Sequence, residues 1–102
     1  MTARMVTYRV KDGRSEENAA YVRDVMADLD ARSTEGVAYS VYLLEDGVTF
    51  LHVVEEEGEG EGEGGRLQVS EAFQRFTATL VEDRCADTPQ LHQMTLVGSY
   101  GG

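Results

Sequence analysis

A hairpin in the middle of the chain constrains the fold more than any other feature. Two runs rich in β-branched and aromatic residues, 37–44 and 48–54, are separated by Glu45-Asp46-Gly47. An Asp-Gly pair between such runs is typical of a tight turn joining antiparallel strands. With a two-residue type I′ loop, Glu45 opposes Val48 and every other pair follows, whereas a three-residue loop shifts the pairing.

This register gives the hairpin two faces, because successive side chains of a strand point to opposite sides. One face carries Tyr39, Val41, Leu43, Phe50, His52 and Val54. The other face carries Ser40, Tyr42, Leu44, Thr49, Leu51 and Val53. Since both faces are largely apolar, both need to be covered.

A strand and a helix precede the hairpin. Residues 5–10 alternate, with Val6, Tyr8 and Val10 on one side, and Asp12-Gly13 ends this strand. We expect Ser15 to cap a helix that ends near residue 33. The inward stripe of this helix is expected to consist of Ala19, Val22, Met26 and Leu29.

A helix and a strand also follow the hairpin. The second helix is expected to start at or near Ser70, to point Phe73, Phe76 and Leu80 inward and to carry Arg84 in its last turn. Thr88-Pro89 ends this region, and Leu91 to Val97 is expected to form the last strand.

The order β-α-β-β-α-β predicts an α+β fold of the ferredoxin-like type, with an antiparallel sheet and both helices on one face. We expect residues 1–102 to form one such domain. The helices cover only one side of the hairpin, so the apolar set on the other side predicts a homodimer that pairs through the sheet face.

The run 55–65 consists of six glutamates and five glycines, and we expect it to be a flexible loop. Its spacing matches no calcium loop, so a solvated spacer is favoured over a cation site. The net charge of −10 and the lack of a basic stripe argue against nucleic-acid binding.

No apolar run is long enough to span a membrane, and no secretion signal is evident. The single Cys85 cannot form an internal disulfide, and its place after a helix end favours an inert thiol. We therefore expect a cytoplasmic protein.

The order of the elements, the hairpin with its Glu-Asp-Gly turn and the Phe73-x-x-Phe76 helix resemble the dimeric α+β barrel superfamily. Within it, the chain is most similar to the small proteins grouped with antibiotic biosynthesis monooxygenases. The resemblance covers nearly the whole chain apart from the Glu-Gly run, and it implies an active-site cleft between helices and sheet. Members include cofactor-free oxygenases, haem-degrading enzymes and proteins of no known function.

His52 is the main catalytic candidate. If its face of the hairpin meets the helices, it points into that cleft, where an imidazole that titrates near neutrality could act as a base. A partly buried structural histidine is the competing interpretation. His92 alternates with Met94 and Leu96 and is a weaker candidate for the same cleft. The two histidines have no carboxylate at ligand spacing, so no metal site is expected.

Aromatic side chains are the candidates for binding a quinol-like ligand, although tyrosines in strands are commonly core or interface residues. The candidates are Tyr8, Tyr39, Phe50, Phe73 and Phe76. Related haem degraders use a tryptophan in the pocket, and this chain has none, so no cofactor is expected.

Two functions remain open. One is a homodimeric small-molecule-binding protein that acts as a cofactor-independent monooxygenase of phenolic or quinol-like aromatics, with His52 as the base. The other is a non-catalytic dimer in which Phe73, Phe76, Met26 and Leu29 fill the space between helices and sheet, leaving no cleft larger than about one water molecule. A third, weaker option is that the Glu-Gly run docks a basic partner.

Overall fold

A computed structural model of the chain describes residues 2–57 and 65–101. Four strands form one antiparallel sheet in the order β2-β3-β1-β4. The strands are β1 (Thr2–Arg9), β2 (Val37–Leu43), β3 (Thr49–Glu56) and β4 (Gln90–Met94). The helices are α1 (Ser15–Ala31) and α2 (Glu71–Thr79), with a short 3-10 helix (Gly65–Val69) before α2 and a π-helical turn (Leu80–Arg84) after it.

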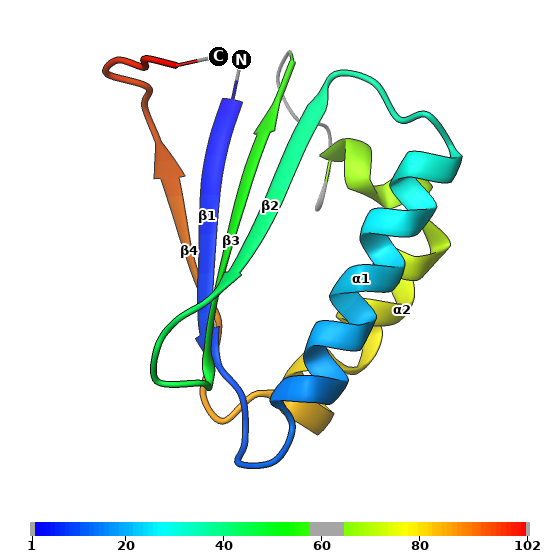
Figure 1. The fold of residues 1–102 in the computed structure, drawn as a ribbon, viewed down its shortest axis with the longest axis vertical. Helices are drawn as coiled ribbons and strands as arrows, with labels where there is room; N and C mark the ends of the chain where they lie inside the picture. Colours follow the sequence, from blue (N-terminus) through cyan, green and yellow to red (C-terminus); the bar gives the residue numbers. More distant parts are fainter. Residues whose placement is uncertain (1, 58–64, 102) are drawn as a thin grey trace.

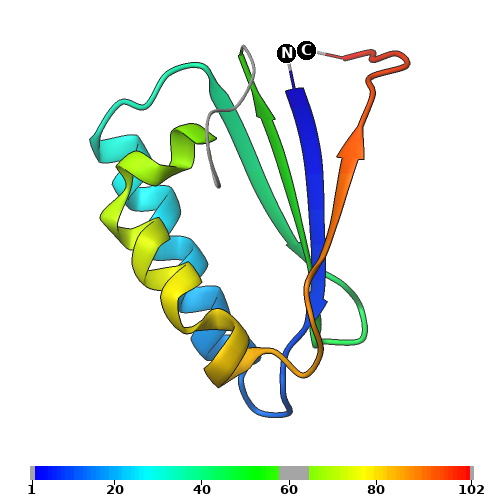
Figure 2. The ribbon, with the colours of Figure 1, turned by 180° about the vertical axis from the view of Figure 1, so that it is seen from behind.

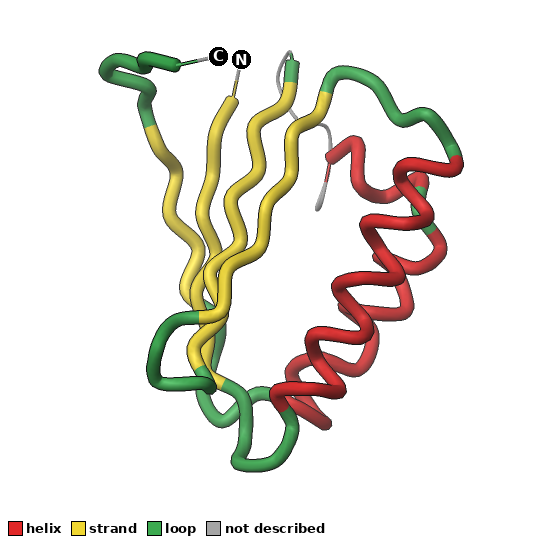
Figure 3. Tube along the Cα trace, in the orientation of Figure 1, coloured by secondary structure: helices red, strands yellow, loops and turns green. Residues whose placement is uncertain are grey.

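Both helices pack on the same face of the sheet, and the other face is bare (Figures 1 and 2). The expected α+β ferredoxin-like arrangement is therefore confirmed. The helical and sheet layers approach each other where β1 leads into α1, and they diverge toward the end at which both chain termini lie (Figure 3).

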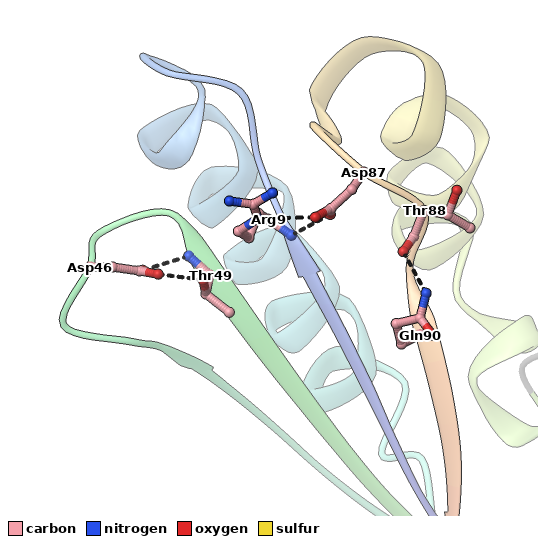
Figure 4. Close-up of polar contacts among 6 residues, drawn as sticks. All are labelled: Arg9, Asp46, Thr49, Asp87, Thr88 and Gln90. Atoms are coloured by element: carbon pink, nitrogen blue, oxygen red, sulfur yellow. Dashed lines mark hydrogen bonds and ion pairs between the residues drawn. The ribbon is translucent and has the colours of Figure 1, made fainter.

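The hairpin has the expected register but a different turn. Leu43 pairs with Phe50, and the ladder continues by backbone bonding from Leu44 N–H to the Thr49 carbonyl. A type I′ turn needs positive φ at both central residues, but only Gly47 has one, at 77°. Instead the Asp46 carboxylate accepts from the backbone N–H and the hydroxyl of Thr49 (Figure 4). It also accepts from the backbone N–H of Val48.

The expected division of the strands into two faces is correct. Phe50, His52 and Val54 of β3 are buried under the helices, whereas Tyr42 on the other face of β2 is 57 % exposed. The core also contains Tyr8, Val10, Val22, Val25, Leu67, Ala72, Phe73, Phe76, Leu80 and Cys85. The first strand begins earlier than expected, at Thr2.

Helix α1 differs in two details from the prediction. Ser15 is its first residue rather than its N-cap, and the Ser15 hydroxyl donates to the Gly47 carbonyl. Its fully covered residues are Asn18, Val22 and Val25. Ala19, Met26 and Leu29 are only partly buried and pack around this row.

Helix α2 begins as predicted, because the Ser70 hydroxyl accepts from Phe73 N–H at 3.1 Å. Its last turn is π-helical and is closed by Cys85 N–H bonding to the Leu80 carbonyl at 2.9 Å. Arg9 then ties β1 to the following segment through an ion pair with Asp87 (Figure 4).

Two boundaries are corrected. Strand β3 continues through Glu56, whereas the loop was expected to begin at Glu55. Residues 58–64 of the expected loop lie outside the described part of the chain. Strand β4 ends at Met94 rather than Val97, and Val97 is fully exposed. Within residues 2–57 and 65–101, no helix has both the length and the apolar character needed to cross a membrane.

Candidate functional site

A cavity of about 590 Å³ lies between the sheet and helix α2. It is lined by Thr2, Arg4, Val6, Tyr8, Tyr39, His52, Val54, Leu67, Phe73, Phe76, Thr77, Leu80, Val81, Pro89, Leu91 and Gln93. A volume of this size is typical of small-molecule sites. It contradicts the filled core that the non-catalytic alternative requires. A second hollow of about 610 Å³ lies beside the end of α1, and no aromatic residue lines it.

His52 lies on the cavity's sheet-side wall. Its Nε2 lies 2.8 Å from the Tyr8 hydroxyl, and its Nδ1 lies 2.7 Å from the Tyr39 hydroxyl. The imidazole stacks on Phe76 of α2 at a centroid distance of 5.4 Å. Both ring nitrogens are thus occupied by phenolic oxygens, and the ring is held in one orientation.

Burial determines the protonation of this cluster. It lowers the pKa of His52 to about 4, because no anionic partner offsets the loss of water around an imidazolium. Burial likewise raises the pKa of Tyr8 and of Tyr39 far above the ordinary value for a phenol. The three side chains are therefore neutral at physiological pH.

The polar chain continues behind Tyr8 into the helical layer. Asn18 of α1 donates from Nδ2 to the Tyr8 hydroxyl at 2.8 Å, and its Oδ1 accepts from Nε of Arg84 at 2.9 Å. Tyr8, Asn18 and Arg84 are all buried. A single line of hydrogen bonds therefore joins Arg84 to His52 and on to Tyr39.

Arg84 is a buried cation held by neutral groups. Besides Asn18 it donates to the Thr79 hydroxyl and the Phe76 carbonyl, each at 2.7 Å, and its guanidinium lies 4.0 Å from the centre of the Tyr21 ring. Within residues 2–57 and 65–101, no carboxylate forms an ion pair with it. A positive charge therefore stands uncompensated behind the cavity wall.

Arg4 of β1 brings a second positive charge to the wall itself. Its Nη1 contacts Oε1 of Glu56, whose Oε2 accepts from Arg66 N–H at 2.9 Å. Although burial alone raises the pKa of the Glu56 carboxyl, these hydrogen bonds hold it below its ordinary value. Glu56 is thus an anion that orients Arg4.

The structure brings together five of the predicted site residues. Tyr8, Tyr39, His52, Phe73 and Phe76 all line the cavity. Two predictions are wrong in their placement. Phe50 is not among the cavity-lining residues and stacks behind Tyr8 at a centroid distance of 5.7 Å.

His92 is the second misplaced candidate. It is exposed and pairs with Met5 on the bare face, because its neighbours Leu91 and Gln93 are the ones that point toward the helices. The alternation along β4 was therefore assigned to the wrong side.

Sequence reasoning missed Arg4, Asn18 and Arg84. Two of them carried a signal. Arg4 shares the period-two face of Tyr8, and Asn18 lies one helical turn before Val22 on the buried row. Arg84 carried none, because its inward direction depends on the π-helical turn that ends α2.

Residues 2–57 and 65–101 contain no group of three or more metal-ligating side chains. Cys85 is buried, and burial raises the pKa of its thiol, in line with the inert role expected for it.

Comparison with known proteins relates this architecture to solved structures. A solved antibiotic biosynthesis monooxygenase superposes with a TM-score of 0.71 at 14 % identity, covering 96 % of this chain and 100 % of its own. A Nitrosomonas europaea protein provisionally given that name has a TM-score of 0.76 at 12 % identity, with 96 % and 100 % covered. A Mycobacterium tuberculosis protein has 0.67 at 14 % identity, with 98 % of each chain covered.

This chain has the fold of the antibiotic biosynthesis monooxygenases. The sequence itself matches no protein-family model and no curated protein. At such low identity the likeness establishes the fold, and the activity has to be argued from the site.

Proposed function

We propose that this protein binds a phenolic or quinol-like aromatic molecule in the cavity between sheet and α2, and oxygenates it without a cofactor. The observation that carries the proposal is the cavity itself, which combines an apolar aromatic wall with the Tyr8–His52–Tyr39 cluster. Phe73 and the other apolar side chains of the lining provide contact area for an aromatic ligand, and the cluster offers hydrogen bonds to its oxygen atoms.

The reaction draws all its electrons from the substrate. Loss of the phenolic proton gives an electron-rich phenolate, which passes one electron to dioxygen. The resulting phenoxyl radical and superoxide combine at a ring carbon that bears hydrogen, which forms a hydroperoxide. This hydroperoxide then loses water to leave a quinone. One oxygen atom becomes the new carbonyl and the other leaves as water, so no external reductant is consumed.

His52 is the proposed proton acceptor. Each of its nitrogens already contacts a tyrosine hydroxyl, so a ligand proton reaches the imidazole only through Tyr8 or Tyr39. The pKa of His52 is about 4, whereas that of an ordinary phenol is about 10. This difference opposes transfer by about 8 kcal/mol, so the phenolate needs a further source of stabilisation.

Oxygen uptake in the presence of a hydroquinone, corrected for spontaneous oxidation, tests the activity. We expect uptake by the wild-type protein to collapse in His52→Ala and to be retained in His92→Ala, since His92 lies outside the cavity. Thermal unfolding of both variants checks that they fold. Equal uptake by a folded His52→Ala variant would remove the proposed role of His52.

A non-catalytic binding protein is the second candidate function, and the same cavity supports it. In that case the hydroquinone binds, as measured by calorimetry, and consumes no oxygen above the buffer rate. His52→Ala then changes only affinity and stability.

We further propose that the protein is a homodimer joined through the bare face of the sheet. Tyr42 and Leu44 on that face are 57 % and 40 % exposed, and Leu51 and Val53 on the neighbouring strand β3 are only partly covered. A second copy of the chain that covers this apolar surface removes it from water, which stabilises the dimer.

A further inference from the structure

We propose that the cavity binds its ligand through an anionic oxygen, a phenolate or enolate, that accepts hydrogen bonds from the Tyr39 hydroxyl and the Arg4 guanidinium. The inference concerns the same cavity as the proposed function. It makes a separate claim, because it specifies the charge state that the site selects, whether or not oxygen then reacts.

The orientation of the polar chain begins at Arg84. A guanidinium has only donors, so the Asn18 atom that faces it must be the carbonyl oxygen Oδ1. The amide Nδ2 of Asn18 then points at Tyr8 as a donor, and the Tyr8 oxygen is an acceptor in that contact. Arg84 thus fixes which way Asn18 is turned.

Tyr8 in turn selects the tautomer of His52. With its oxygen accepting from Asn18, Tyr8 can donate its own hydrogen to Nε2, and the proton of the neutral imidazole then resides on Nδ1. If Nε2 carried the proton instead, the Tyr8 oxygen would accept from both Nε2 of His52 and Nδ2 of Asn18, and the Tyr8 hydrogen would have no acceptor among the described residues. The first arrangement pairs the hydrogens of Asn18 Nδ2, Tyr8 and His52 that take part in the chain and leaves over only that of Tyr39, which is less buried than Tyr8.

The tautomer of His52 determines the role of the Tyr39 hydroxyl. Its oxygen accepts the Nδ1 proton of His52, so its own hydrogen is left for the cavity that Tyr39 lines. The site therefore presents a hydroxyl donor, and a ligand atom placed there has to be an acceptor. Nε2, on the Tyr8 side, remains the nitrogen through which His52 can take up a proton.

Arg4 lies two strands away from this donor, on the same face of the sheet. Tyr39 pairs with Val54 across β2 and β3, and Val54 pairs with Arg4 across β3 and β1, so the three residues form one row on the cavity face. The row is about 10 Å wide between the outer Cα atoms. The Tyr39 hydroxyl is turned along β3 toward His52 and the Arg4 guanidinium toward Glu56, so a ligand oxygen that accepts from both has to lie between them, over Val54. The positive charge of Arg4 also partly counters the rise in the pKa of Tyr39, as expected for neighbours.

The charges that face this row favour an anion. Arg4 is the only charged residue among those that line the cavity in the described part of the chain. Its partner Glu56 is held by Arg4 and by Arg66 N–H, His52 and Tyr8 are neutral, and the guanidinium of Arg84 stands behind the wall. Helix α2 contributes Phe73, Phe76 and Thr77 to the lining, none of which is charged.

Arg4 has donors to spare for a ligand. Its side chain is 16 % exposed, and Nη1 is its only nitrogen with a hydrogen-bond partner among the described residues. A charge-assisted bond from this group and a neutral one from Tyr39 supply the stabilisation that the weak basicity of His52 cannot.

The probe for a test is 4-nitrophenol, which ionises near neutrality and turns yellow as the phenolate. Its titration is followed with and without the wild-type protein. We expect the bound phenol to ionise at lower pH than the free phenol, with the anion bound at least about tenfold more tightly than the neutral form.

Two variants test which residues cause the preference for the anion. Tyr39→Phe removes the hydroxyl and is expected to weaken binding of the anion about tenfold while leaving the neutral form nearly unchanged. Arg4→Met combined with Glu56→Gln removes the cation without stranding a buried carboxylate, and it is expected to abolish the preference. Arg9→Met is the matched control, because Arg9 is exposed and does not line the cavity.

Binding without a shift in ionisation, a shift to higher pH, or no binding of the probe would each overturn the inference. So would a preference that survives in the Arg4→Met/Glu56→Gln variant. Failure of the proposed function looks different: the phenolate is bound preferentially and hydroquinone consumes no oxygen. Oxygen uptake together with an unshifted probe would retain the function and reject the anionic mode.

Discussion

The imidazole of His52 is neutral over most of the pH range because the protein surrounds it with phenols and apolar rings. The imidazole pKa is about 4 in the folded protein, against about 6.5 in an unfolded chain. Between these values the unfolded state binds a proton that the native state does not, so stability rises with pH through this window and is lost as pH falls from 6.5 toward 4.

The first prediction follows from this difference. The free energy of unfolding should fall by up to about 3 kcal/mol between pH 7 and pH 4 on account of His52 alone. Urea unfolding at a series of pH values measures it. In His52→Gln the loss between pH 7 and 5 should shrink, whereas His92→Gln should behave as wild type. Identical pH profiles for wild type and His52→Gln would contradict the assigned protonation state.

Arg84 and Asn18 are expected to be strongly coupled. Asn18→Leu leaves the guanidinium without one of its acceptors and should destabilise the protein by about 2 to 4 kcal/mol. In Arg84→Met the charge itself is gone, so adding Asn18→Leu should cost about 1 kcal/mol less than in the wild type. A double-mutant cycle by urea unfolding measures this coupling, and additive effects would show that Asn18 does not support the cation.

At the scale of a single element, the hairpin turn depends on Gly47. Its φ of 77° is unfavourable for any residue with a Cβ, yet no atom stands close to where that Cβ would be. Gly47→Ala should therefore destabilise the protein by about 1 kcal/mol through backbone strain alone.

Gly98→Ala is the matched control for this third prediction. Gly98 also has open space around it and has no positive φ, so its replacement should leave the melting temperature unchanged. Equal melting temperatures for the two variants would mean that the turn relaxes without cost.

Helix α2 shows what the end of one element contributes to the site. Its Phe73 and Phe76 follow from helical periodicity, but the π-helical turn that closes it does not. That turn directs Arg84 under α1, where it meets Asn18. The position of the cation therefore depends on a local departure from α-helical geometry.

The whole molecule has one covered and one bare sheet face, which is the basis of the fourth prediction. Native mass spectrometry should give a dimer. Leu51→Lys places a charge in the middle of the bare face and should yield monomers, because a buried, unpaired ammonium opposes association.

Ala20→Lys serves as the control for the assembly, since Ala20 is exposed on α1, on the opposite side of the molecule. It should remain dimeric. A monomeric wild type, or a Leu51→Lys variant that stays dimeric, would reject pairing through this face.

Local patterns were sufficient for much of this protein. The alternation of Val6, Tyr8 and Val10, and the register of the hairpin, follow from the period-two geometry of strands, and they put Tyr39 and His52 on one face of the hairpin. The β-α-β-β-α-β order then left few ways to cover an apolar sheet face, which is why the fold class was predictable.

The chemistry of the cavity was decided by the tertiary structure. Tyr8 and His52 are 44 residues apart, and Asn18 and Arg84 are 66 apart, so no local pattern records their contacts. The side of the sheet on which His92 lies depended on the pairing of β4 with β1. The sequence by itself determined which side chains share a face, because that is set by backbone geometry; only the packed structure determined which of them meet, because burial forces each polar group to find a partner wherever the fold brings one.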